Sequence, residues 1–531
     1  MNIVVNNLCH IFPDGTSIFS DVSFSIEAKS KCALVGANGC GKSLLMSILS
    51  GREKPAGGEV FLGDSPYLVP QHFGQFNSMT VAEVLRVKDK IEALNAILSG
   101  DAEETDFSIL DDDWSIEERV RSALEVWGLT HVSLDTCMSS LSGGEKTKVF
   151  LAGIMIHNPQ IILMDEPSNH LDEETRTKLY DFIDTVQSTV LVVSHDVMLL
   201  NRFFVIYELS AKGICRYTMR FDEYRAYIEN ENRVQTENVD RLRKDLRKEK
   251  LIAREVTARQ QKHNSRGQRH TEKKCVARIA MGNMKNRAEN STAKLTGMHQ
   301  AKIDRLTESV AEASSMIYDI SRMKVDLSSS DAHTGKVQIE MQGVNFAYSG
   351  KCDLWASPLD FVVRSGDRIR VIGGNGSGKS TLMKIIMGHE SPSRGRVLSS
   401  DDLRCLYLDQ EYSLIDNGVT VSEQIQIYNR NSLPEHELNI RLNRFLFPKS
   451  TWGKSCAVLS GGEKMRLSLC CLMVSENAPD IIIADEPTNN LDLYNIEVLT
   501  NVLKTYSGTL IVISHDKSFT DQLFLSREII L

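Results

Sequence analysis

Two short glycine-rich segments have the composition of loops that hold phosphate groups. The first reads GANGCGKS over residues 36–43, and the second reads GGNGSGKS over residues 373–380. Glycine lets the backbone come close to phosphate oxygens, and the loop N–H groups and the following helix N-terminus donate hydrogen bonds to them. The predicted contacts are Gly36, Asn38, Gly39, Cys40, Gly41, Lys42, Ser43, Leu44, Gly373, Asn375, Gly376, Ser377, Gly378, Lys379, Ser380 and Thr381. Within this set the two lysines would contact the β- and γ-phosphates, and the two serines that follow them would ligate Mg²⁺.

A second repeated motif supplies carboxylates at the end of an apolar stretch. It reads IILMDEPSNHLD in the first half of the chain and IIIADEPTNNLD in the second. Asp165 and Asp485 would hold Mg²⁺, either directly or through water. Glu166 and Glu486 come next and are placed to polarise a water molecule that attacks the terminal phosphate. The two motifs together predict hydrolysis of ATP at two sites.

Four polar side chains are predicted to lie near the terminal phosphate. His195 and His515 each follow an apolar run within an SHD motif, where an imidazole can hydrogen-bond the γ-phosphate. Gln71 and Gln410 lie after the glycine-rich loops, where an amide can sense both the γ-phosphate and Mg²⁺. We therefore expect these four side chains to take part in hydrolysis.

Two aromatic residues are candidates for stacking on the adenine ring. Phe12 precedes the first glycine-rich loop by 24 residues, and Tyr348 precedes the second by 25. Packing in the core is a nearly equal alternative for Phe12.

Each half also contains an LSGGE motif, at residues 141–145 and 459–463. Its Ser-Gly-Gly part suits contact with phosphate at the start of a helix. The residues concerned are Ser142, Gly143, Gly144, Ser460, Gly461 and Gly462. The spacing between the two copies is 318 residues for LSGGE and 320 for the DEP and SHD motifs. Four motifs repeated in one order indicate two copies of one kind of domain.

The elements that position these residues are predicted to be buried strands of parallel sheets. Short apolar runs lead into a glycine-rich loop, an acidic motif or a histidine. They are Ala33–Val35, Ile161–Met164, Val190–Val193, Ile369–Ile372, Ile481–Ala484 and Leu510–Ile513. Ligands of open parallel sheets bind at the carboxyl ends of the strands, where these motifs stand. The predicted fold class is therefore α/β, with two nucleotide-binding domains at residues 1–222 and 336–531.

The first domain carries about 21 residues more than the second between its glutamine and its LSGGE motif. Val81–Leu98 and Ile116–Trp127 are predicted as helices on either side of an acidic loop. This pattern predicts an arm-like helical insertion at about 81–127. A loop extension without a role is the alternative.

Residues 223–335 differ from the two domains in charge and in the spacing of their apolar residues, and they are predicted to form a basic helical hairpin linker. Apolar residues recur at heptad spacing in two arms, from Val239 and from Ile303, with Glu249 interrupting the first series. Residues 233–300 contain 18 basic and 7 acidic residues, a local charge of +11, whereas the chain as a whole carries −9. Such a segment suggests a polyanionic partner, and a solvated charged spacer is the alternative. The cations predicted to bind RNA at the hairpin tip are Arg266, Arg269, Lys273, Lys274 and Arg278.

Composition excludes several other classes of protein. A content of 42 % hydrophobic and 25 % charged residues is ordinary for a soluble globular chain. No run of about 18 apolar residues occurs, so no membrane span is expected. The N-terminal residues lack the pattern of a signal peptide, and the eleven cysteines lack metal-ligand spacing. We expect a cytoplasmic protein with reduced thiols.

The chain as a whole resembles the F family of ATP-binding cassette proteins (ABC-F), which are ribosome-associated translation factors. The resemblance rests on the order cassette, basic helical linker, cassette, and on the sequences PSNHLD and PTNNLD. It implies two P-loop cassettes that pair head to tail within one monomer, so that each glycine-rich loop faces the LSGGE motif of the other cassette. It also implies ATP and Mg²⁺ as ligands, the ribosome as partner, and a linker that reaches toward peptidyl-tRNA and ribosomal RNA. Cys40 and Leu44 depart from the usual loop.

Two other classes stay open at this point. An ATPase subunit that energises a separate membrane permease would have a short linker between its cassettes, unlike this chain. A DNA-associated ATPase of the same superfamily would usually separate its halves by long coiled coils or zinc modules.

Overall fold

A computed structural model describes residues 2–11, 17–210, 213–272, 297–311, 313, 335–348, 352–400, 403–409, 412–429, 432–475, 479–489 and 491–531. The chain divides into two compact units. One unit combines Met1–Phe221 with Met323–Leu531, and the other is Asp222–Arg322. Below, the part of the first unit up to Phe221 is called the first cassette, and its part from Gly335 onward is called the second cassette.

A six-stranded sheet forms the centre of the first cassette. Its strand order is β5-β6-β7-β3-β8-β9, and every neighbouring pair is parallel except β8 with β9. The strands are β3 (Lys31–Val35), β5 (Pro66–Val69), β6 (Ile161–Asp165), β7 (Thr189–Val193), β8 (Val205–Ser210) and β9 (Gly213–Thr218). Both β6 and β7 are buried along their whole length, as expected for a parallel sheet covered on both faces. The apolar stretches predicted as parallel strands in this half are confirmed.

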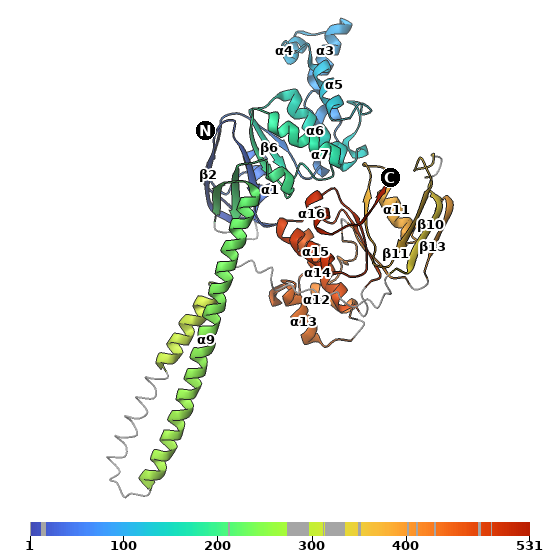
Figure 1. The fold of residues 1–531 in the computed structure, drawn as a ribbon. Coiled ribbons are helices and arrows are strands. Elements are labelled where there is room, and N and C mark those ends of the chain that lie inside the picture. The colour runs from blue at the N-terminus through green and yellow to red at the C-terminus, as the bar shows by residue number, and fades with distance from the viewer. Residues whose placement is uncertain are drawn as a thin grey trace. The chain divides into compact units, whose positions relative to one another are not determined.

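An antiparallel sheet and several helices complete the first cassette (Figure 1). The sheet has the order β2-β1-β4, and its apolar residues join those of β3, β6 and β7 in one buried cluster. Its strands are β1 (Ile3–Ile11), β2 (Ser17–Ile26) and β4 (Gly57–Leu62). The helices outside the insertion are α1 (Lys42–Leu49), α6 (Gly143–His157), α7 (Glu173–Thr185) and α8 (Val197–Leu200).

The insertion of the first cassette is helical, but its boundaries differ from the prediction. The expected single helix over Val81–Leu98 is wrong, because the structure has α2 (Val81–Val84) followed by α3 (Lys88–Ser99). The break falls at Arg86, whose φ of 55° is left-handed and incompatible with a continuous right-handed helix. The expected acidic loop contains a further helix, α4 (Glu104–Leu110), and α5 (Ile116–Val126) follows it.

The second cassette repeats the plan of the first. Its five-stranded sheet has the order β14-β15-β16-β12-β17 and is parallel throughout. A three-stranded antiparallel sheet has the order β11-β10-β13. The strands are β10 (Val337–Asn345), β11 (Leu359–Arg364), β12 (Arg368–Ile372), β13 (Arg394–Ser399), β14 (Cys405–Leu408), β15 (Ile481–Asp485), β16 (Thr509–Ile513) and β17 (Arg527–Ile530). The helices are α11 (Lys379–Ile386), α12 (Val421–Ile427), α13 (Glu435–Arg444), α14 (Gly461–Val474), α15 (Leu493–Thr505) and α16 (Lys517–Gln522). The predicted parallel strands of this half are confirmed as well.

The second unit contains a long helix, α9 (Phe221–Glu272), and a helix over 297–311 that lies alongside it (Figure 1). Glu249, which interrupts the apolar series of α9, is 7 % exposed. Its carboxylate accepts a hydrogen bond from Lys302 Nζ at 2.8 Å and contacts His299 Nδ1 at 2.8 Å. The apparent defect in the heptad pattern is therefore a polar link between the two helices. In the part of the chain that the structure describes, no helix is both long and apolar enough to cross a membrane.

Candidate functional site

The second glycine-rich loop connects β12 to α11 and is shaped for phosphate. Lys379 Nζ donates hydrogen bonds to the carbonyl oxygens of Gly373 at 2.7 Å and Gly374 at 3.0 Å, which holds the ammonium group across the loop. Gly378 has a φ of 92°, and a Cβ atom there would come within 2.5 Å of the Leu354 side chain. Only glycine fits this turn without strain or a clash.

Asp485 ends β15 and is held by two hydroxyl groups. Its Oδ2 accepts hydrogen bonds from Ser380 Oγ at 3.1 Å and from Tyr407 Oη at 2.7 Å. Burial, with the neighbouring carboxylate, raises the pKa of Tyr407, so its hydroxyl stays protonated and donates. The sequence predicted the pairing of serine and aspartate as Mg²⁺ ligands but missed Tyr407. Its position one residue before the end of an apolar strand was the available signal.

Glu486 and His515 form a second pair beside Asp485. Glu486 Oε1 lies 3.4 Å from His515 Nε2. Burial raises the pKa of Glu486 to about 7 and lowers that of His515 to about 4. The imidazole is therefore neutral at pH 7, and the contact is not an ion pair. A carboxyl group with a pKa near neutrality suits a general base.

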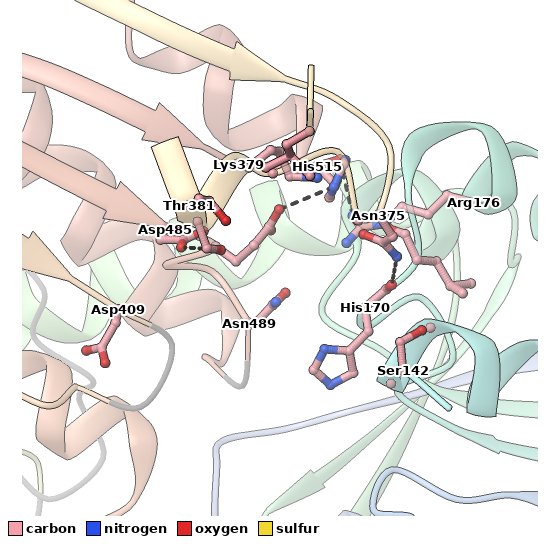
Figure 2. Close-up of a pocket in the computed structure, with 18 of the residues that line it drawn as sticks. Ser142, His170, Arg176, Asn375, Lys379, Thr381, Asp409, Asp485, Asn489 and His515 are labelled. Atoms are coloured by element: carbon pink, nitrogen blue, oxygen red, sulfur yellow. Dashed lines mark hydrogen bonds and ion pairs between the residues drawn. The ribbon is translucent and has the colours of Figure 1, made fainter. Parts of the chain in front are cut away.

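A pocket of about 670 Å³ joins these residues to the first cassette (Figure 2). Its walls include the second glycine-rich loop with Lys379, both carboxylates, and the start of α6 at Ser142, Gly143 and Gly144. Asn375 Nδ2 donates a 2.8 Å hydrogen bond to the carbonyl oxygen of His170 across this junction. The second loop and the first LSGGE motif thus line one cavity, which is the head-to-tail arrangement that the resemblance implied.

The first glycine-rich loop has matching internal geometry. Lys42 Nζ donates to the carbonyl oxygens of Gly36 at 2.7 Å and Ala37 at 3.1 Å. Glu166 Oε1 lies 3.3 Å from His195 Nε2. Burial and the adjacent carboxylate of Asp165 raise the pKa of Glu166 to about 8, and burial lowers that of His195.

Contact between the first loop and the second cassette runs through Asp492. The backbone N–H of Asn38 donates to Asp492 Oδ2 at 3.0 Å. Ser460 caps α14 by accepting from Glu463 N, so Gly461 and Gly462 form its first turn. This is the local geometry predicted for the second LSGGE motif.

A sequence model described as "ABC transporter" matches residues 19–169 and 356–489, more than half of the chain. The chain belongs to the ABC transporter family. Its two matched segments make this protein a tandem ABC ATPase, and its relatives include an ABC-F protein. This ATPase is 26 % identical to "ABC transporter F family member 5" of Arabidopsis thaliana, over 96 % of this chain and 72 % of that one. It is 27 % identical to "Energy-dependent translational throttle protein EttA" of Mycobacterium tuberculosis, over 95 % and 87 % of the two chains.

A solved structure supports the fold of this ABC ATPase. It is described as a complex of archaeal ribosomal stalk protein aP1 and archaeal ribosome recycling factor aABCE1. The TM-score is 0.57 at 18 % identity, over 99 % of this chain and 87 % of that chain. The likeness concerns the arrangement of secondary structure.

The acidic ends of the strands in this ABC ATPase fit a bound Mg²⁺ ion. Asp165 Oδ1 is buried and has no hydrogen-bond partner among the described residues, and Ser43 is exposed beside it. Burial raises the pKa of Asp165, and a hydrogen bond from Ser43 opposes that rise. An unsatisfied carboxylate oxygen next to a hydroxyl is the oxygen-ligand environment that Mg²⁺ takes together with phosphates. The described residues contain no cluster of three or more His, Cys, Asp or Glu side chains that would hold a metal without such a ligand.

The remaining predicted contacts of the ABC sites fall into three groups. Tyr348 lines the pocket, and its hydroxyl lies 2.8 Å from Thr381 Oγ1. Cys40 and Leu44 are half-buried against the core of the first cassette, and burial raises the pKa of the Cys40 thiol. Gln71 is half-buried just beyond β5.

Not all of the predicted site residues lie in the parts of the chain that the structure describes. Phe12 and Gln410 lie outside the described residues, as do Lys273, Lys274 and Arg278. The backbone of Arg266 and Arg269 belongs to α9.

Proposed function

We propose that this ABC-F ATPase is a ribosome-binding translation factor whose cassettes close on ATP and separate after hydrolysis. The observation that carries the proposal is the pocket that contains both Lys379 and Gly144. A nucleotide held there would touch both cassettes at once, so binding would join them and loss of the terminal phosphate would weaken the junction. ATP binding would thus close the two cassettes on each other, and ATP hydrolysis would let them separate.

The proposed hydrolysis uses side chains of one cassette on phosphates that the other cassette also holds. Lys379 and the loop N–H groups would bind the β- and γ-phosphates, and Ser380 with Asp485 would hold Mg²⁺. The ion, when bound, would neutralise phosphate charge. Glu486 would accept a proton from the attacking water, and His515 would hydrogen-bond the terminal phosphate. Ser43, Asp165, Glu166 and His195 would have these roles at the first site.

The basic hairpin supports RNA as the partner. The local charge of +11 over residues 233–300 contrasts with the acidic remainder of the chain. Lysine and arginine side chains on a helical arm neutralise backbone phosphates, and this favours recognition of RNA by shape and charge. The name of EttA describes an energy-dependent translational throttle. We infer a cytoplasmic monomer that acts at the ribosome, with ribosomal RNA and peptidyl-tRNA as the surfaces met by the linker.

The first test is cosedimentation of a trapped form with 70S ribosomes. The double variant Glu166→Gln, Glu486→Gln should bind ATP yet hydrolyse it slowly. We expect it to sediment with ribosomes through a sucrose cushion in ATP and to stay in the supernatant in ADP. Absence from the ribosomal pellet, with ATP binding intact, would contradict the proposal. Copurification with a membrane permease or with DNA would favour the other two classes.

A second test addresses the hairpin. Alanine at Arg266, Arg269, Lys273, Lys274 and Arg278 should weaken ribosome binding and flatten its dependence on salt. For each phosphate that the variant no longer neutralises, the slope of log K against log salt concentration should decrease by about 0.7–0.9. The matched control removes exposed cations from the first cassette, with Arg121 and Lys178 as examples. An unchanged slope in the hairpin variant would disprove the RNA assignment.

A further inference from the structure

Arg176 belongs to the first cassette but lines the pocket of the second site (Figure 2). It lies in the first half of α7, four residues after the Asp172 that ends the DEPSNHLD segment. Its Nη1 donates to the backbone carbonyl oxygen of His515 at 3.3 Å, and its Nε donates to that of Leu171 at 3.1 Å. The guanidinium group therefore spans from one cassette to the histidine of the other.

The cation is buried, which requires compensation from its surroundings. Arg176 is 8 % exposed. Its Nη1 lies 3.9 Å from Asp196 Oδ2, and that carboxylate also accepts a hydrogen bond from Tyr180. Burying a charge is costly unless it is paired and hydrogen-bonded. The carbonyl oxygen of His515 supplies one of these compensating contacts, so the arginine and the histidine loop hold each other in place.

The first site has no equivalent cation at this position. The spacing of 320 residues that relates the two acidic motifs places Ile496 of α15 where α7 has Arg176. Ile496 is half-buried and packs against the apolar core of the second cassette. An isoleucine side chain has no donor for a carbonyl oxygen.

Glu173, three residues before Arg176, also makes contacts beside the second site that have no counterpart, among the described residues, beside the first. Glu173 contacts Lys517 Nζ and lies 3.8 Å from Arg370 Nη2, and both cations belong to the second cassette. The same spacing relates Glu173 to Leu493 and Lys517 to Val197. The seam beside the second site is therefore charged, whereas the equivalent positions beside the first site are apolar.

We propose that Arg176 is a positioning residue of the second ATP site, acting from the other cassette through the backbone of His515. When the cassettes meet, its hydrogen bond fixes the segment that carries the imidazole. The two ATP sites are then unequal, because turnover at the second site depends on a residue of the first cassette and turnover at the first site has no such dependence. The proposal rests on the ATPase activity and not on the ribosomal partner, so failure of the ribosome test would leave it standing.

The experiment measures each site separately in the full chain. Glu166→Gln leaves turnover to the second site, and Glu486→Gln leaves it to the first. Arg176→Ile, which copies the residue of the other cassette, is added to each background. We expect kcat of the second site to fall roughly tenfold or more, since small misplacements of catalytic groups cost that much, while KM for ATP stays within about twofold. In the Glu486→Gln background, where only the first site turns over, Arg176→Ile should lower kcat by a factor at least about fivefold smaller than it does at the second site.

Two further variants separate positioning from simple damage. Arg176→Lys keeps a donor and should restore part of kcat. Lys178→Ile removes an exposed cation from the same helix, where it pairs only with Glu174 among the described residues, and should leave kcat within about twofold. An equal decrease in both backgrounds, a rise in KM at constant kcat, or no recovery with lysine would each overturn the proposal. Thermal melting of every variant shows whether the chain is folded.

Discussion

The side-chain amide of Asn375 donates a hydrogen bond to the backbone carbonyl oxygen of His170, 205 residues earlier in the chain. Gly144 lies against both partners. A Cβ atom on this glycine would come 2.6 Å from the His170 oxygen and 2.9 Å from Asn375 Nδ2. The junction between the cassettes therefore depends on the absence of a side chain at one position of the LSGGE motif.

Gly144→Ala should push the first LSGGE motif away from the second phosphate loop. The methyl group meets a backbone oxygen that has little room to move, so we expect kcat of the second site to fall about tenfold or more. Steady-state ATPase measurements in the Glu166→Gln background report this site alone. Gly453→Ala is the matched control, because a Cβ atom there meets nothing within 4 Å. Equal activity of the two alanine variants would contradict the prediction.

Tyr407→Phe should weaken the hold of the second site on Mg²⁺. The variant lacks the hydroxyl that fixes Asp485 Oδ2, and one hydrogen bond to a charged group corresponds to roughly a tenfold change in an equilibrium constant. We expect the Mg²⁺ concentration for half-maximal turnover to rise about three- to tenfold in the Glu166→Gln background. β14 pairs Tyr407 with Ile483, and β5 pairs Leu68 with Leu163, so Leu68 takes this place at the first site. A rise of the same size in the Glu486→Gln background would show that the tyrosine does not act locally.

Glu486→Gln should stabilise the protein at alkaline pH. The folded pKa of Glu486, about 7, lies above the usual value of an unfolded glutamate, which is about 4.3. Below about pH 4 the Glu486 carboxyl group is protonated in both the folded and the unfolded protein, so it does not affect stability. As the pH rises from about 4 toward 7, the unfolded chain ionises this group more readily than the folded one, and the free energy of unfolding falls. Removing the carboxylate should recover on the order of 4 kcal/mol at pH 8, since the shift is about 2.7 pKa units at about 1.4 kcal/mol each. Thermal melting at pH 5 and pH 8 checks this, because the gain should be larger at pH 8. A gain of equal size at both values would refute the assigned pKa.

Glu249→Gln should remove a stabilising contribution to the hairpin that is present near neutral pH and is lost in acid. Hydrogen bonds from Lys302 and His299 lower the pKa of Glu249. Its stabilising effect is therefore present above the unfolded pKa of about 4.3 and is lost as the pH falls through the lower folded value. Amide hydrogen exchange over residues 239–256 of the full chain should be slower in the native protein than in the variant at pH 6. The difference should shrink toward pH 4, and a constant difference would rule out the carboxylate as its source.

Much of the fold followed from the sequence because its signals are local. The apolar runs before Asp165 and Asp485 predicted β6 and β15, and the glycine-rich loops predicted where α1 and α11 begin. The break between α2 and α3 was missed because the apolar periodicity continues past Arg86, and the capping box of Thr80 and Glu83 marks only the start of α2.

Residues whose roles depend on partners far along the chain were missed or misread. Tyr407 reaches a carboxylate on the neighbouring strand, and Arg176 reaches a carbonyl oxygen of the other cassette. Neither belongs to a repeated motif. Glu249 was interpreted as a defect in an apolar series because Lys302, its partner, lies 53 residues later. Sequence periodicity describes one helix at a time and carries no information about such pairs.

The backbone beneath the two proposed general bases has a consequence for how this chain can evolve. Glu166 and Glu486 have φ angles of 51° and 46°, a left-handed conformation that glycine or asparagine adopts more cheaply. Each also buries a carboxyl group that prefers water. Selection for heat resistance alone should therefore replace these glutamates first and yield sturdier chains without turnover. Hydrolysis at the two proposed sites would therefore be retained at a cost in folding stability, which is the conflict between activity and stability expected of strained, buried catalytic groups.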